Sequence, residues 1–121
     1  MTLRTNCVCA WEVLPVTLGT GESLTSLINL EGLRLFGVAL PAAWTAANLS
    51  FQVSPNAGAT WFELLDNDGA AIVTGVAASG CSMVDPKIFA PFQYIRIRSG
   101  TAATPVAQLA ARELQLFLRS I

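Results

Sequence analysis

The chain has 121 residues, a length that suits one domain spanning 1–121, with residues 1–10 as an extended N-terminal arm. Seven Lys and Arg residues nearly balance eight Asp and Glu residues, so the formal net charge of −1 provides no field that would attract nucleic acid or an anionic membrane. No apolar run reaches the ~20 residues of a membrane span, and Glu12 and Pro15 interrupt the N-terminal apolar stretch, so no standard export signal is expected.

Apolar residues dominate the composition. The hydrophobic class makes up 53% of the chain and charged residues 12%, about half of their usual share. A free monomer with so few charges exposes apolar patches and tends to associate. The composition therefore favours a subunit whose surface is largely covered by other subunits. The alternative is an ordinary, alanine-rich domain.

Short strand-like segments separated by turn residues run through the chain, which predicts an all-β protein. Segment 48–54 alternates cleanly and places Leu49, Phe51 and Val53 on one face, as a strand of an antiparallel sheet does. In chain order the predicted strands are 11–18, 22–30, 33–40, 48–54, 60–66, 71–77, 93–99 and 112–120, and 81–84 adds a short extended piece.

Two residues mark irregular positions in these strands. Pro15 has no backbone N–H to donate to a neighbouring strand, so 11–18 is expected at a sheet edge or at a bulge. Segment 33–40 is apolar on both faces, as a central strand is, and Gly37 is expected to mark a bulge in it.

Helical structure is expected only in single turns. The connection 41–47 has room for at most one. A second turn is predicted where Asp85 acts as an N-cap and Pro86 takes the first helical position. Pro91 ends this turn soon after it begins.

The C-terminal segment fits two structures. As a helix it would be capped by Thr104, begin at Pro105 and carry an apolar stripe at helical spacing. As a strand over 112–120 it directs every second residue, a leucine each time, to one face. We expect the strand, because the seven other strands need an even partner. Eight short strands with turns every 8–12 residues or so predict an antiparallel two-sheet β-sandwich with a jelly-roll-like arrangement.

The stretch "SPNAGATW" is close to the Asp-box, Ser-x-Asp-x-Gly-x-Thr-Trp, a hairpin turn that recurs in the propellers of sialidases. Asn56 replaces the Asp but can still bond local backbone amides, Gly58 suits a positive φ, and Trp61 packs under the turn. The box occurs once, and the chain is too short for a set of propeller blades. The motif therefore predicts a turn and not a glycosidase.

The sequence offers no catalytic constellation, and we expect no enzyme. Without histidine there is no Ser-His-Asp set and no base for a cysteine, and no glycine-rich phosphate loop is present. Asp66 and Asp68 lie in one turn, with Asp68 and Gly69 as its tight-turn pair, so they are not the opposed carboxylates of a glycoside hydrolase. No cofactor or metal is expected. A weak calcium site at 66–69 is the alternative, without EF-hand spacing.

The cysteines are Cys7, Cys9 and Cys81, an odd count that argues against a closed disulfide framework. Cys-x-Cys without a second pair or a histidine does not predict zinc. We expect free thiols or small apolar residues of the core. Disulfides between subunits are the alternative.

Contacts with other subunits are expected at three apolar places: the N-terminal arm, the connection 41–47 and the turn around Pro91. Internal packing is the alternative at each. Arg96 and Arg98 share an outward face, where they pair with a neighbouring subunit or with Glu63. The candidate interface residues are Cys7, Cys9, Trp11, Trp44, Phe89, Phe92, Arg96 and Arg98.

The stretches "LSFQVSPNAGATWFELLDNDG" and "DPKIFAPFQYIRIRSGTAATPVAQ" resemble a group of small proteins encoded by tailed bacteriophages and prophages. Their shared pattern is "FxVSxDGGxTW", then "DxDG", then "DPxxFxxxxYIRxRSGTxxxPVxQ" and a last apolar strand. The resemblance covers roughly 49–118. Asn56 and Ala57 depart from the Asp and Gly of the turn but leave the turn feasible. The N-terminal third carries no match.

The resemblance implies a non-enzymatic virion component with a β-sandwich fold, made in the cytoplasm of a host bacterium. Its partners would be itself, as a homo-oligomer such as a trimer, and other virion proteins such as a major capsid protein. We expect a capsid decoration or cement subunit. One alternative is a neck, tail or baseplate subunit. The other is a carbohydrate-binding module of a phage fibre that stacks sugars on Trp11, Trp44 and Trp61.

Overall fold

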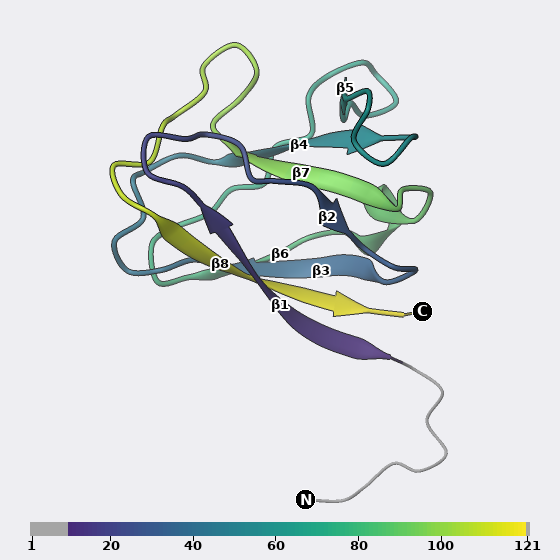
Figure 1. Ribbon diagram of the computed structural model, residues 1–121, viewed down its shortest axis with the longest axis horizontal. Coiled ribbons are helices and arrows are strands. Elements are labelled where there is room, and N and C mark those ends of the chain that lie inside the picture. Colours follow the sequence, from purple (N-terminus) through teal and green to yellow (C-terminus); the bar gives the residue numbers. More distant parts are fainter. Residues whose placement is uncertain (1–9, 121) are drawn as a thin grey trace, which may run out of the picture.

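The computed structural model describes residues 10–120, whose strands form two four-stranded sheets that face each other (Figure 1). All named strand pairs are antiparallel, so the predicted β-sandwich is confirmed. The elements are β1 (Trp11–Leu18), β2 (Ile28–Asn29), β3 (Arg34–Ala39), β4 (Leu49–Ser54), β5 (Phe62–Glu63), β6 (Cys81–Met83), the 3-10 helix η1 (Pro86–Phe89), β7 (Tyr94–Ser99) and β8 (Arg112–Arg119).

The two sheets have the strand orders β1-β8-β3-β6 and β2-β7-β4-β5, and they are called the first and the second sheet below. Strands that follow each other in the chain lie in different sheets, except for β4 and β5, which are neighbours in the second sheet. This order is that of a jelly roll, in which two Greek keys wrap into a double sheet. In Figure 1 the second sheet lies above the first.

The core lies between the sheets and takes one face of each long strand. Leu114, Leu116 and Leu118 are buried along β8, and Ile95 and Ile97 are buried along β7. Burying a side chain of this size contributes about 1.5–3 kcal/mol. The other buried apolar residues of the strands are Leu18, Ile28, Leu35, Val38, Leu49, Phe51 and Val53.

The C-terminal segment forms the predicted strand and not the helix. β8 pairs with β1 along its whole length and with β3 on its other side. A helix would lose the hydrogen bonds of both ladders. These bonds outweigh the apolar stripe that a helix would present, because the strand already buries its leucines. Thr104 lies in a turn in which its carbonyl accepts from the N–H of Thr101, and Pro105 forms a bridge with Gly100.

Pro15 and Gly37 lie where the sequence predicts. β1 is an edge strand, so the missing N–H of Pro15 costs no bond to a second neighbour. In β3 the register against β8 shifts between Leu35 and Gly37, which is the expected bulge.

Segment 71–77 is not a strand, contrary to prediction. It runs from the edge of the second sheet to β6 of the first, so it bonds to each only locally. Ala71 and Thr74 form isolated bridges with Leu65 and Leu49. The eighth strand is instead β6, which the sequence indicated only as a short extended piece.

Two other predicted strands are mostly irregular. Of 22–30 only β2 is a strand, although Leu24 forms a bridge with Arg98 and the N–H of Thr25 donates to the carbonyl of Ile97 at 2.9 Å. Of 60–66 only β5 is a strand. Both are edge segments, where a single neighbour leaves the backbone free to depart from the ladder.

The helical turn after residue 85 is confirmed as η1. The carboxylate of Asp85 accepts from the N–H of Lys87 at 3.0 Å, and Pro86 takes the first position. The connection 41–47 contains a hydrogen-bonded turn but no helix. Within residues 10–120 no helix is long and apolar enough to cross a membrane.

Candidate functional site

The structure places the predicted interface residues in different environments. Trp11 is exposed, whereas Phe92 and Arg96 are half-buried. Cys7 and Cys9 lie outside the described residues. Cys81 is a free, exposed thiol on β6, so it is not a core residue.

Three of the predicted interface residues are buried inside the chain. Trp44 closes the core and donates from Nε1 to the carbonyl of Ala47 at 3.1 Å. Phe89 packs edge-to-face on Phe51 with ring centroids 5.1 Å apart. Arg98 is 3% exposed. These side chains do not have the surface position that an interface requires, and that part of the prediction is wrong.

The three tryptophans do not form a sugar-stacking platform. Trp44 is buried in the core. Trp11 begins β1 in the first sheet, whereas Trp61 lies beside Arg96 of the second sheet, with the guanidinium carbon 4.3 Å from the ring centroid. Because the cation covers one face of this indole, that face is not free for a sugar.

The Asp-box-like stretch is a turn, as predicted. Asn56 Oδ1 accepts from the N–H of Thr60 at 2.8 Å, and Ser54 Oγ accepts from the N–H of Gly58 at 2.8 Å. Gly58 has a φ of 92°, and a Cβ there would lie 3.5 Å from the Trp61 ring. The motif therefore positions a hairpin and provides no carboxylate.

Replacing Ala57 by glycine should stabilise the protein. Ala57 has a φ of 58°, a left-handed conformation that costs an L-residue about 1–2 kcal/mol and costs glycine little. Glycine also gives the unfolded chain more freedom, which offsets part of the gain. We expect the free energy of unfolding to rise by about 0.5–1 kcal/mol in urea denaturation. Ala59→Gly, two residues away without a positive φ, should lower it. Equal effects of the two variants would contradict this explanation.

The second turn depends on Asp66 more than on the predicted Asp68. Asp66 Oδ1 accepts from the N–H groups of Asp68 at 2.8 Å and Ala70 at 3.0 Å, and Gly69 has a φ of 82°. Asp68 is exposed. The sequence signal for Asp66 was its place at the start of the turn, where a side-chain acceptor bonds the amides that follow.

A polar cluster lies on the outward side of the second sheet. Both carboxylate oxygens of Glu63 on β5 accept hydrogen bonds from the guanidinium of Arg98 on β7, with N–O distances of 2.6–2.7 Å. Gln52 on β4 donates to Glu63 and accepts from Arg96 Nε at 2.6 Å. Burial first, and then the nearby charge of Arg98, lower the pKa of Arg96, while Glu63 opposes this shift. The two arginines therefore bond to Gln52 and Glu63 of the same chain, which is the pairing with Glu63 that the sequence offered for them.

This cluster has no catalytic or metal-binding arrangement. Glu63 is its single carboxylate, and its oxygens are occupied by Arg98 and Gln52. Among the described residues no group of three or more His, Cys, Asp or Glu side chains is placed to hold a metal ion. The arrangement ties β4, β5 and β7 of the second sheet together.

Gln108 makes a network of buried hydrogen bonds that no local pattern in the sequence predicts. Its side chain is fully buried. Its Oε1 accepts from the N–H of Thr45 at 2.9 Å, and its Nε2 donates to the Thr45 carbonyl at 3.1 Å and to Ser99 Oγ at 2.8 Å. Its backbone bonds Gly21 and Glu22. Gln108 therefore joins three loops to the end of β7.

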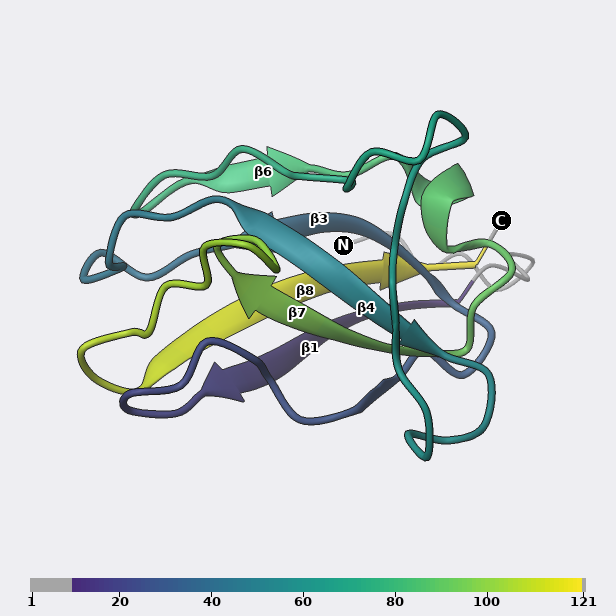
Figure 2. The same cartoon turned by 90° about the horizontal axis from the view of Figure 1, so that it is seen from above.

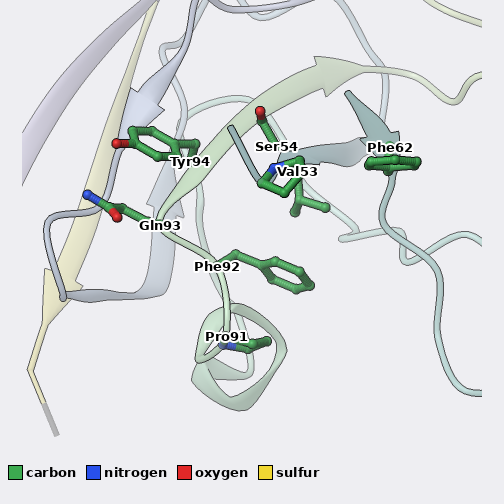
Figure 3. A pocket seen from close by; sticks show the side chains of 8 residues that line it. Val53, Ser54, Phe62, Pro91, Phe92, Gln93 and Tyr94 are labelled. Atoms are coloured by element: carbon green, nitrogen blue, oxygen red, sulfur yellow. The ribbon is translucent and has the colours of Figure 1, made fainter. Parts of the chain in front are cut away.

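An apolar cleft of about 410 Å³ opens at one end of the sandwich (Figure 3). Phe62 on β5 is 56% exposed, and Figure 3 shows Phe92 and Val53 between it and Pro91. The lining residues are Val53, Ser54, Pro55, Phe62, Pro91, Phe92, Gln93 and Tyr94. The cleft includes the predicted contact turn at Pro91 and Phe92, whereas Phe62 was missed.

A second apolar surface lies on the side of the first sheet that faces away from the core. A groove of about 390 Å³ runs over it. Trp11 and Val13 on β1, Phe36 on β3 and Phe117 on β8 line this groove together with charged residues. The alternation of a strand predicts that these side chains point away from the core, because they alternate with the inward-facing residues of the same strand.

The fold and these surfaces define the class of this chain as a jelly-roll β-sandwich with apolar outer surfaces. Comparisons with family models, with curated proteins and with solved structures found no match.

Proposed function

We propose that this chain is a non-enzymatic structural subunit of a tailed bacteriophage particle, most directly a capsid decoration or cement subunit. It is made in the bacterial cytoplasm and stabilises the shell through contacts with itself and with other virion proteins. Support comes from the sequence pattern over 49–118, from the low content of charged residues and from the exposed apolar side chains.

The observation that carries the proposal is what the residues of the shared pattern do. Arg98 pairs with Glu63, Gln108 joins loops, and Gly58 and Trp61 build a turn. Among the described residues every buried side-chain nitrogen and oxygen has a hydrogen-bond partner. These roles support a scaffold, and we place its contacts with partners in the apolar cleft and on the first sheet.

Weak contacts suffice for such a role, because many copies act together on one shell. Each site gains from effective concentration once its neighbours are bound. A subunit of the neck, tail or baseplate needs the same kind of scaffold and remains the second candidate. A fibre module that binds carbohydrate through the tryptophans is less favoured, because they do not share a surface.

The number of copies per particle tests the proposal. In purified particles, quantitative mass spectrometry against the major capsid protein should find hundreds of copies for a shell subunit. A small multiple of three or six would place the chain in the neck, tail or baseplate. A host cytoplasmic protein measured in the same sample serves as the control for contamination. Abundance no higher than that of the control would overturn the virion role.

A further inference from the structure

We propose that two copies of this chain pack back to back through the outer face of the first sheet. This inference deepens the proposed function, on which its biological meaning rests, by naming the surface and the partner. The outer face is the side of the first sheet opposite the core, and no described segment lies over it in Figure 1. It is formed by those side chains of β1, β3, β6 and β8 that point away from the core, among them Trp11, Val13, Met83, Glu113, Phe117 and Arg119.

The centre of the outer face is apolar across all four strands. Val13 on β1 pairs with Phe117 on β8, Phe117 with Gly37 on β3, and Gly37 with Met83 on β6. Met83 is 91% exposed and Trp11, at one end, is 73% exposed. A contiguous apolar patch of this kind, bordered by polar residues, marks an interaction site.

The two ends of the outer face carry opposite charges. Arg34 on β3 and Arg119 on β8 are register partners at one end. Glu113 lies at the other end of β8, ~20 Å away at about 3.4 Å per residue. It accepts there from Gln115 Nε2 at 2.6 Å. Glu12 lies at the rim of the cationic end, opposite the buried Leu118 in register.

This distribution of charge selects one arrangement of the two copies. A two-fold axis parallel to the strands would place Arg119 against Arg119 of the second copy. An axis across the strands reverses their direction and places Arg119 against Glu113, twice by symmetry. Such an isologous contact is self-complementary. It also brings the apolar centres together, so the outer face fits a second copy of itself.

The size of the outer face fits a weak dimer. The four strands have 8, 8, 6 and 3 residues. At about 3.3 Å per residue and about 4.8 Å per strand they give roughly 400 Å² of projected face, which protruding side chains increase. A standard interface buries about 800 Å² per partner, and weak complexes bury less. We therefore expect dissociation in the micromolar range. The near-neutral charge of the chain adds little repulsion.

Sedimentation velocity of the full chain tests the proposal, over roughly 1–200 μM, the range of a weak interface. We expect a monomer–dimer equilibrium. Phe117→Glu and Met83→Glu should weaken dimerisation at least about tenfold, because each places a charge in the apolar centre. Met83 is so exposed that its replacement leaves folding intact. Phe62→Glu, an equally drastic change in the apolar cleft, is the matched control and should dimerise like the unchanged chain.

A charge exchange tests the predicted axis. Arg119→Glu and Glu113→Arg should each weaken the dimer, and the double variant should recover most of the affinity. A chain that stays monomeric at about 200 μM, or that forms trimers instead of dimers, would overturn the proposal. So would full dimerisation of Met83→Glu, and failure of the double variant to recover would overturn the axis. A monomer that is abundant in particles would overturn the dimer and leave the virion role intact. A dimer that is absent from particles would overturn the virion role and leave the dimer intact.

Discussion

Replacing Gln108 by alanine is expected to lower the free energy of unfolding by about 3–5 kcal/mol, because it leaves several buried groups without partners. The N–H and carbonyl of Thr45 and the hydroxyl of Ser99 all bond the Gln108 side chain. Arg112 Nε also donates to Gln108 Oε1, at 3.3 Å. Urea denaturation monitored by circular dichroism measures the loss as a lower midpoint with an unchanged slope.

Two further variants separate hydrogen bonding from packing at this position. Gln108→Met keeps the volume and removes the polar contacts, so it should lose nearly as much stability as alanine. Gln93→Ala removes an exposed amide that, within residues 10–120, makes one hydrogen bond, to Asn29 Oδ1 at 3.3 Å, and it should cost less than about 1 kcal/mol. If Gln108→Met were as stable as the unchanged chain, the network would be dispensable and packing would explain the burial.

Replacing Glu63 by alanine is expected to cost about 3 kcal/mol. It leaves the guanidinium of Arg98, whose side chain is 4% exposed, buried without a counter-charge. Removing one partner of a buried ion pair costs more than the pair contributes when intact. The same urea measurement applies. The exposed carboxylate of Asp68, replaced by alanine, provides the control and should change stability by less than about 0.5 kcal/mol.

The double variant Glu63→Ala, Arg98→Met makes this test more specific. It removes both charges and fills the site of Arg98 with an apolar chain, so it should be more stable than Glu63→Ala alone. Additive losses from the two single variants would contradict an interaction between these charges. They would indicate that each residue stabilises the fold through its packing only.

The sequence predicted the long strands, and its evidence was strongest where the two faces of a strand differ. In β4, β7 and β8 alternate residues are apolar, and burial on one side of the sheet fixes their register. β2, β5 and β6 are two or three residues long, too short for a period of two to be recognised. The sequence therefore predicts only a short extended piece at 81–84. It predicts a strand at 71–77 because an apolar crossing between sheets has the composition of a strand.

Alternation predicted the side of the sheet on which Arg98 lies, but not what covers that side. Arg98 Nη1 donates to Ser50 Oγ at 3.4 Å and to Glu63 Oε1 at 2.7 Å, so residues from distant parts of the chain enclose the arginine. The burial of Gln108 has the same origin. Such coverage depends on the path of loops in three dimensions, which no local pattern encodes. The predicted interface position of Trp44 is wrong because an apolar residue in a connection suits the core as well as an interface.

The position of β8 has a consequence for how the chain acquires its structure during synthesis. Trp11 pairs with Arg119, and β8 separates β1 from β3 in the sheet (Figure 2). While a ribosome is still making β8, both neighbours lack their partner and their edges stay open to wrong pairing. Pairing across such a long stretch of chain is also slow. The first sheet therefore closes only after translation has passed β8, and until then the edges of β1 and β3 that pair with β8 are exposed in the nascent chain.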